Sequence, residues 1–415
     1  MFKRTLAVCV AAASISATNA QAADVEVLHW WTSGGEAKSV AYLKEKLAEA
    51  NVGWEDFAVA GGGGESAMTV LKSRAASGNP PTAAQIKGPS IQEWGDLGFL
   101  ADIDTVAKSN NWDALLPSVV SDVMKFDGKY VAAPVNVHRV NWLWANPSVF
   151  QKAGATIPTT WDDFIVQAKK VQDAGFIALA HGGQAWQDAT VFEAVVLGVG
   201  GADYYQKAFV ELDADALNSA TTEEVFRVFG ELRQFVDSNA AGRDWNIATS
   251  MVINGEAAMQ IMGDWAKGEF TVAGKTPGVD YACVAAPGTS GAFTFNVDSF
   301  AFFNQADSNA QAAQQEMAKQ ILGEDFQKVF NLNKGSIPAR LGMARDEFDS
   351  CAHASMDAFV ASAQTGGLVP SFAHGMAVSE AVSGAIYDTA TNFFNSDQSA
   401  ADAKAQLIAS IQAAM

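Results

Sequence analysis

The sequence predicts an α/β protein with two lobes, in which helices cover mostly parallel sheets. Three observations support this prediction. Strand and helix patterns alternate in the N-terminal part of the chain, as they do in parallel sheets with crossover helices. Two long extended apolar segments, 129–145 and 293–303, lie far apart in the sequence. The chain also has 415 residues, which is too long for one ordinary domain and fits two lobes.

The composition is that of a core-rich and strongly acidic globular chain. Hydrophobic residues make up 49% of the sequence and charged residues only 18%, which excludes a disordered chain. There are 46 acidic residues against 27 basic ones, and the formal net charge is -19. An acidic surface repels phosphate backbones and anionic lipids, so we expect no nucleic-acid partner and no peripheral membrane role.

Residues 1–22 have the pattern of a cleavable secretory signal peptide. A positively charged pair, Lys3 and Arg4, precedes a short apolar run at 6–15, and Ala-Gln-Ala at 20–22 resembles a cleavage site. The apolar run is shorter than the roughly 18 residues of a membrane span, and no later stretch approaches that length. We therefore expect a soluble periplasmic protein.

Two cysteines, Cys283 and Cys351, remain after removal of the signal peptide. An even number of cysteines in an oxidising compartment predicts one disulfide, and two buried free thiols are the alternative. The five histidines of the sequence show no metal-ligand spacing. The sequence therefore predicts no metal site, because two lone cysteines are too few ligands for one.

The N-terminal elements alternate between strands and helices with short connections. Gly78-Asn79-Pro80-Pro81 is a strong stop signal for the second helix. The order predicts a parallel sheet covered by helices. The expected strands lie at 25–29, 54–59 and 83–86, and the expected helices at 36–50 and 65–77.

The remainder of the chain contains two extended crossings separated by helices. Residues 129–145 are mostly extended and are interrupted by Pro134, which suits a passage between lobes. Within 147–290, Thr160 is expected to cap one helix, and Thr221-Thr222-Glu223-Glu224 reads as the capping box of another. The extended run at 293–303 is followed by predicted helices at 308–331 and over the last 60 residues. Each lobe is then discontinuous, and the cleft between such lobes is a natural ligand site.

No recognisable catalytic or cofactor motif is present in the sequence. The metalloprotease pattern HExxH and the nucleophile elbow GxSxG are both missing, and a phosphate-loop-like stretch at 268–276 has one residue too many between its glycines. The glycine run at 61–64 lacks the spacing of a dinucleotide fingerprint. It predicts either a close approach of the backbone to a neighbour or a simple turn.

Aromatic and polar residues gather near the predicted element ends. Of the 11 tryptophans, Trp30 and Trp31 come immediately after the first strand, at the sheet edge that faces a ligand crevice. Both cannot point into one core, so at least one should line the cleft. A sugar suits such a site, because its C–H faces stack on indoles and its hydroxyls need charged or amide partners. The candidate polar partners are Glu36, Lys87, Asp298, Lys334 and His374.

Motifs along essentially the whole mature chain resemble those of one protein family. They are LHWWTSGGEAKSV, SGNPP, APVNVHRVNWLWAN, NGEAAMQIMGDWAKGEF, FNVDSFAFF, NKGSIPAR and SFAHGM. In combination they resemble the extracellular (periplasmic) sugar-binding proteins of bacterial ABC importers, family 1, and specifically the pseudomonad-type glucose-binding proteins. The usual GNPPD of that group appears here as GNPPT at 78–82.

The resemblance implies the type II periplasmic-binding-protein fold, in which two α/β lobes joined by three crossings close around one sugar. Two stretches, 23–134 and 297–345, would form the N-terminal lobe. The C-terminal lobe would consist of 139–292 and 350–415. The hinges would lie near 135–138, 293–296 and 346–349.

The resemblance also implies the residues that hold the sugar. Trp30 and Trp31 would be stacking walls of the N-terminal lobe, and Trp245 and Trp265 would face them from the other lobe. Glu36, Lys87, Asp298 and Lys334 would bind hydroxyls from the N-terminal lobe, and His374 would add a hydrogen bond from the opposite side. His138 and Asn141 lie at the first crossing and are given no role.

The implied function is that of a monomeric receptor that delivers a monosaccharide to an ABC transporter permease. Glucose is the first choice, with galactose, mannose or a disaccharide as alternatives, and presentation to a chemoreceptor is compatible with this role. An exported glycoside hydrolase is a different class, for which Glu36 and Asp298 would be the carboxylate pair. Lys87 and Lys334 near them would keep both ionised, which suits a general acid poorly. We therefore expect no enzymatic activity and no cofactor.

Overall fold

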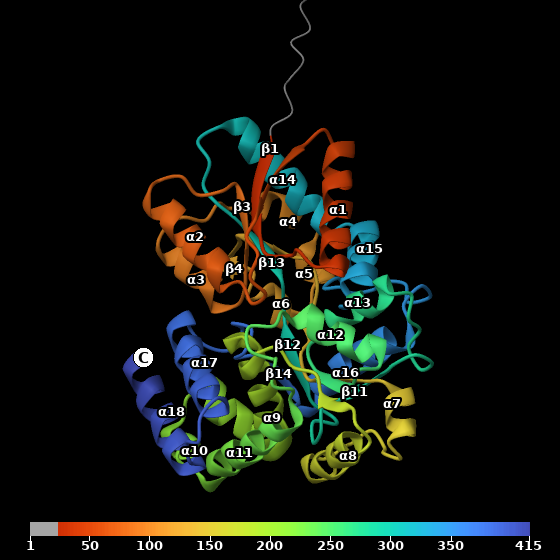
Figure 1. Cartoon of the computed structure of the whole chain (residues 1–415). Coiled ribbons are helices and arrows are strands. Elements are labelled where there is room, and N and C mark those ends of the chain that lie inside the picture. Colours follow the sequence, from red (N-terminus) through yellow and green to blue (C-terminus); the bar gives the residue numbers. More distant parts are fainter. Residues whose placement is uncertain (1–23) are drawn as a thin grey trace, which may run out of the picture.

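The computed structural model describes residues 24–415, so the predicted signal peptide lies outside the described residues. The chain forms two α/β lobes, one above the other in Figure 1. No helix within residues 24–415 is long and apolar enough to cross a membrane.

The upper lobe contains a five-stranded sheet in the order β2-β1-β3-β13-β6. β1 (Asp24–His29) pairs in parallel with β2 (Gly53–Ala58) and β3 (Ala83–Ile86). β13 (Ser299–Phe302) and β6 (Ala132–Pro134) are joined by antiparallel pairing. The sheet is therefore mixed, and the expected parallel order holds for its first three strands.

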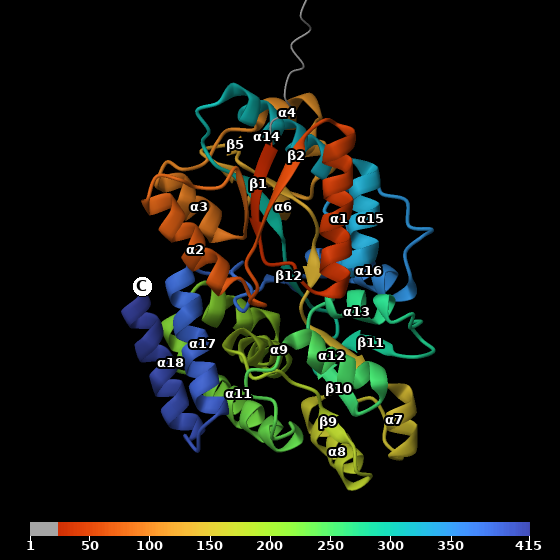
Figure 2. The same ribbon diagram turned by 45° about the horizontal axis from the view of Figure 1, so that its top comes forward.

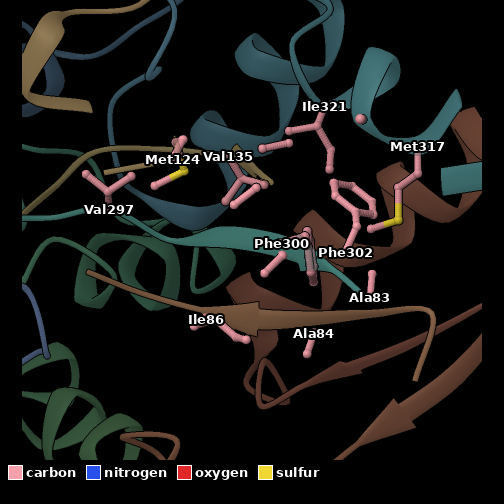
Figure 3. Packing of buried hydrophobic residues seen from close by; sticks show 14 of the residues in the cluster. Ala83, Ala84, Ile86, Met124, Val135, Val297, Phe300, Phe302, Met317 and Ile321 are labelled. Atoms are coloured by element: carbon pink, nitrogen blue, oxygen red, sulfur yellow. The ribbon is translucent and has the colours of Figure 1, made fainter. Parts of the chain in front are cut away.

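Helices cover both faces of this sheet, with α1 and α15 on one side and α2 and α3 on the other (Figure 2). The central strands β3 and β13 are buried along their whole length, as expected for strands covered on both faces. Figure 3 shows Phe300 and Phe302 of β13 packed near Met317 and Ile321 of α14. The helices of this lobe are α1 (Gly34–Glu49), α2 (Glu65–Ala76), α3 (Pro89–Asp96), α4 (Asp104–Ser109), α5 (Trp112–Leu115), α6 (Ser118–Ser121), α14 (Ser308–Ile321) and α15 (Glu324–Lys334), and a hairpin is formed by β4 (Lys125–Phe126) and β5 (Lys129–Tyr130).

The lower lobe contains a four-stranded sheet in the order β11-β8-β10-β9. β8 (Trp142–Ala145) pairs antiparallel with both β11 (Ala282–Ala285) and β10 (Ala257–Ile261), and only β9 (Ile177–Leu179) is parallel to its neighbour. The expectation of a mostly parallel sheet is thus wrong for this lobe, because β8 enters directly from the crossing. Its helices are α7 (Pro147–Lys152), α8 (Trp161–Asp173), α9 (Ala185–Tyr205) with a π-helical end at Gln206–Val210, α10 (Ala214–Leu217), α11 (Ala220–Glu231) with a 3-10 turn at Leu232–Phe235, α12 (Trp245–Asn254), α13 (Ala266–Val272), α16 (Ser350–Thr365), α17 (Glu380–Phe394) and α18 (Ala400–Ala414).

A three-stranded sheet lies where the chain passes between the lobes. β12 (Phe293–Asn296) is its centre, with β7 (His138–Arg139) antiparallel on one side and β14 (Leu368–Pro370) parallel on the other. The extended crossings predicted from the sequence are therefore hydrogen-bonded to each other rather than running separately.

Three local predictions have different outcomes. Thr160 caps α8 as expected, because its Oγ1 accepts a hydrogen bond from the Asp163 amide at 3.2 Å. The predicted capping box at 221–224 is wrong, because α11 already begins at Ala220. The hydroxyl of Thr222 instead lies 2.7 Å from that of Tyr204, inside the lobe. The last 60 residues are also not wholly helical, since β14 and a loop at 371–379 precede α17.

Cys283 and Cys351 form the predicted disulfide, with their Cα atoms 6.0 Å apart. The bond joins β11, at the edge of the lower sheet, to the first turn of α16. It therefore fastens the chain to the lower lobe immediately after the segment at 346–349.

Candidate functional site

A narrow cavity of about 30 Å³ lies between the two lobes and is bordered by residues from both. All nine residues singled out in the sequence border it, namely Trp30, Trp31, Glu36, Lys87, Trp245, Trp265, Asp298, Lys334 and His374. Its remaining lining residues are Gly62, Gly63, His138, Trp186 and Asn296, which the sequence analysis did not assign.

Five tryptophans border the cavity, and they come from both lobes. They are Trp30, Trp31, Trp186, Trp245 and Trp265. Trp31 also packs into the upper core. Its ring makes edge-to-face contacts with Phe300 and Phe330, at 5.5 and 5.3 Å between ring centroids. The lower lobe supplies Trp265, which lies against the imidazole of His374 at 4.8 Å between ring centroids. The cavity is therefore lined by indoles from both lobes.

A buried ion pair of Glu36 and Lys334 borders the cavity, with Oε1 and Nζ 2.6 Å apart. Glu36 stands in the first turn of α1 and Lys334 is the last residue of α15, so each charge complements its helix dipole. α15 ends there because Gly335 adopts a φ of 93°, which favours glycine. Two helix ends distant in sequence thus bring opposite charges to one place.

Asp298 and Lys87 supply a second pair of charges. Asp298 lies between β12 and β13 and accepts hydrogen bonds from Gln85 and Asn136, each at 3.3 Å. Burial would raise the pKa of Asp298, but the charge and hydrogen bond of His138, with the charges of Lys87 and Lys334, bring it well below its usual range. Lys87 has no ion-pair or hydrogen-bond partner within residues 24–415, and its Nζ lies 5.3 Å from the Trp30 ring. Burial lowers the pKa of this amine.

His138 links the two lobes through carboxylates. Its Nδ1 bonds to Asp264 of the lower lobe, and its Nε2 lies 2.9 Å from Oδ2 of Asp298 in the upper lobe. An imidazole that donates to two carboxylates must carry both protons. Burial alone would lower the pKa of His138, but the charges and hydrogen bonds of Asp264 and Asp298 raise it. The sequence placed His138 at the crossing but gave no sign of this bridge, because its partners lie 126 and 160 residues away.

The sequence matches the model of the bacterial extracellular solute-binding protein family over residues 26–320. The chain belongs to this family. Membership places the protein outside the cytoplasm, as expected from the sequence.

Two relatives, from Brucella suis and Rhizobium meliloti, are each named a probable sugar-binding periplasmic protein. The first is 47% identical over 391 residues, which cover 94% of this chain and 92% of the relative. The second is 46% identical over 406 residues, which cover 98% of both.

A solved structure of the same fold is that of the bacterial solute receptor AcbH, described as having an exclusive preference for β-D-galactopyranose. It superposes with a TM-score of 0.80 and 17% sequence identity, covering 94% of this chain and 99% of the receptor. The likeness confirms the two-lobed α/β fold predicted from the sequence. At this level of identity it carries no information on the ligand.

In this solute-binding protein the glycine run at 61–64 permits a close contact between the lobes. A Cβ atom at Gly62 would lie 2.7 Å from Cζ2 of Trp186, and one at Gly63 would lie 2.9 Å from Cγ of the same indole. The close approach expected from the sequence is confirmed, and its partner is a tryptophan of the lower lobe.

We predict that Gly62→Val weakens ligand binding by roughly tenfold or more. The added methyl groups would hold the upper-lobe loop away from Trp186 and keep the cavity from closing. The ligand-free melting temperature is the control, because the contact joins two lobes rather than forming a core. Isothermal titration calorimetry measures the affinity, and an unchanged dissociation constant would contradict the prediction.

One face of α9 organises the lower side of the cavity. Trp186, Thr190 and Glu193 are spaced i, i+4 and i+7, so they lie on one side of the helix. The Thr190 hydroxyl donates to the carbonyl of Trp186 at 2.8 Å and so accepts from Nε2 of His374 at 3.1 Å. Burial, with the charges of Lys87 and His138, lowers the pKa of His374. The neutral imidazole therefore keeps Nδ1 as a hydrogen-bond acceptor.

Glu193 anchors the loop that carries His374. Its Oε1 accepts from the Ala373 amide at 3.0 Å and from the Tyr205 hydroxyl at 2.7 Å. Its Oε2 accepts from Ser371 at 2.8 Å. Burial raises the pKa of Glu193 to about 7, although these hydrogen bonds act in the opposite direction.

We predict that the free energy of unfolding falls as the pH rises from about 4.5 to about 7, by roughly 3 kcal/mol, because of Glu193. In this range the unfolded carboxyl is ionised while the folded one keeps its proton, so the folded state binds more protons. Glu193→Gln keeps the shape and removes the ionisation. Urea unfolding of both proteins between pH 5 and 8 tests this, and parallel pH profiles would contradict it.

Proposed function

We propose that this protein captures a single monosaccharide between its lobes, with glucose as the first choice. The observation that supports this most strongly is the composition of the interlobe cavity, in which indoles of both lobes surround ionised groups. The indoles can stack on both faces of a pyranose, while Asp298 and Glu36 can accept from hydroxyls and Lys87 and Lys334 can donate to them. Two relatives that are nearly half identical carry sugar-binding names.

The proposal includes a movement of the lobes. The N-terminal lobe would consist of 23–134 and 297–345 and the C-terminal lobe of 139–292 and 350–415, rotating about 135–138, 293–296 and 346–349. Sugar bound between them would favour the closed state, which a membrane permease of an ABC importer would then recognise. The exported monomer would act in the periplasm after loss of residues 1–22. A chemoreceptor could recognise the same closed state.

We propose no catalytic step at this site. A glycoside hydrolase would need a protonated carboxyl beside the scissile bond. Asp298 is held ionised by His138 and two lysines, and Glu36 is paired with Lys334. Neither carboxyl is then suited to act as a general acid.

The proposal is tested by a thermal-shift panel of glucose, galactose, mannose and maltose. A specific ligand raises the melting temperature by mass action, and glucose is expected to give the largest shift. In calorimetry, Trp265→Ala should weaken the best ligand by roughly tenfold or more while leaving the fold intact. A larger shift with another sugar would replace glucose, and no shift with any sugar would refute the proposal.

A further inference from the structure

A second cavity lies beside the first, between α2 and α3 of the upper lobe and α17 of the lower lobe, and has a volume of about 220 Å³. Four residues border both cavities, namely Trp30, Gly63, Lys87 and His374. The two cavities are therefore neighbours, and a group attached to a sugar in the first would have to pass these four residues to enter the second. Apart from Lys87, the ligand-facing residues of the first cavity are at most 8% exposed, so an attached group needs such a space.

One wall of the second cavity is a single face of α17. Glu380, Ser383, Gly384 and Tyr387 follow the spacing i, i+3, i+4 and i+7. The opposite side is largely apolar. Its apolar residues are Trp30, Met68 and Ile86, and Val378 adds another from the lower lobe.

Gly384 is the residue that keeps this wall open. Glycine inside a helix costs about 0.5–1 kcal/mol relative to alanine. Packing does not require it here, because an added Cβ would meet no atom within 4 Å. The backbone does not require it either, since Gly384 is not among the glycines of positive φ. The missing side chain therefore leaves room in the cavity rather than relieving a clash.

Ser383 offers one polar contact in the same wall. The residue is 5% exposed, and its buried Oγ has no hydrogen-bond partner among the residues that the structure describes. A buried hydroxyl without a partner is costly, and a bound group could satisfy it.

The charges around the second cavity select against anions. Glu65 and Glu380 both border it, and Glu380 pairs with Lys72 at 2.6 Å across the outer rim. The charge of Lys87 is opposed by those of Asp298 and Glu65. A phosphate or carboxylate would meet two acidic side chains, whereas an uncharged apolar group would meet tryptophan, methionine and isoleucine.

We propose that the second cavity is a subsite for the apolar substituent of a glycoside, an aryl or alkyl group attached through the glycosidic oxygen. The protein then takes up glycosides as well as the free sugar. This inference rests on the proposed function, because the sugar ring must occupy the first cavity. The exposed Lys72–Glu380 pair contributes little stability and can open for longer substituents.

The test is calorimetry of the mature protein with glucose and with the α- and β-anomers of 4-nitrophenyl glucoside. We expect one anomer to bind within roughly tenfold of glucose. Gly384→Leu fills the cavity and should weaken that glucoside by roughly tenfold or more, while the affinity for glucose stays unchanged. Ala381→Leu is the matched control, because it adds the same side chain to an exposed position of α17 that borders neither cavity.

Different outcomes separate the subsite from the proposed function. If glucose binds and neither glucoside does, the subsite is refuted and the sugar function stands. The subsite is equally refuted if Gly384→Leu weakens glucose as much as the glucoside. If maltose binds more tightly than the glucoside and Gly384→Leu blocks it, the occupant is a second sugar and the apolar assignment is wrong. If no monosaccharide binds at all, the proposed function itself has failed.

Discussion

Asp298→Ala is expected to lower the affinity for the proposed sugar by roughly a hundredfold or more, about 2.7 kcal/mol. Asp298 is buried at the passage between β12 and β13, and it stays ionised. Each hydrogen bond from a sugar hydroxyl to such a carboxylate contributes about 1.5–3 kcal/mol. The substitution also leaves His138 with one carboxylate instead of two, so the link between the lobes is weakened as well.

A graded series of variants separates these effects. Asp298→Asn keeps the shape and the capacity to accept hydrogen bonds but removes the charge, so its affinity should fall between those of the wild type and the alanine variant. Asp188→Ala is the matched control, because Asp188 is also buried and also bonded to a histidine, His181, at 2.7 Å. Asp188 does not border the interlobe cavity. Equal losses of affinity in both alanine variants would mean that the effect is one of stability alone.

The parts of the site that could be predicted are those set by local sequence. Trp30 and Trp31 follow a clear strand, and in an α/β sheet the strand end faces the ligand crevice. Glu36 and Lys334 stand at helix ends, which short patterns such as a glycine cap make recognisable. All nine residues named from the sequence border the cavity, Trp245 and Trp265 being named through the family resemblance alone, and their roles toward a ligand remain predictions.

The parts that could not be predicted depend on packing between distant segments. Trp186 lies on α9, a helix buried almost all round, so no amphipathic pattern distinguishes its cavity-facing side. The place of that indole is decided by Gly62 and Gly63, which come from the other lobe. The capping box at 221–224 failed for a related reason, because Thr222 bonds inside the lobe to Tyr204. The tertiary contact of Thr222 with Tyr204 therefore outweighs the local capping pattern.

The mixed sheets follow from the passage of the chain between the two lobes. A chain that crosses between lobes enters the next sheet from the opposite direction, so β8 and β13 run antiparallel to the strands on both sides of them. The crossings also bring Asp264 and Asp298 to the two sides of His138. The charged cluster that joins the lobes is thus also part of the proposed sugar site, and we expect closure and binding to respond together to its substitution.

Removal of the disulfide is expected to lower the free energy of unfolding by about 4 kcal/mol. Cys283 and Cys351 are 68 positions apart, and closing a loop of this length restricts the unfolded chain by that amount in the chain-entropy model. The double variant Cys283→Ser/Cys351→Ser should therefore unfold at a markedly lower urea concentration. Neither cysteine borders the interlobe cavity, so sugar affinity at low temperature should stay within about twofold of the wild type.

Reduced wild-type protein provides the control for this variant, because it lacks the bond but keeps the sulfur atoms. If the constraint on the unfolded chain is the cause, reduction and substitution should lower stability by similar amounts. A loss of less than about 1 kcal/mol in both would contradict the prediction, since the model requires several times that amount. A large loss on substitution alone would assign the effect to packing around Cys351, which is 2% exposed, and not to the covalent link.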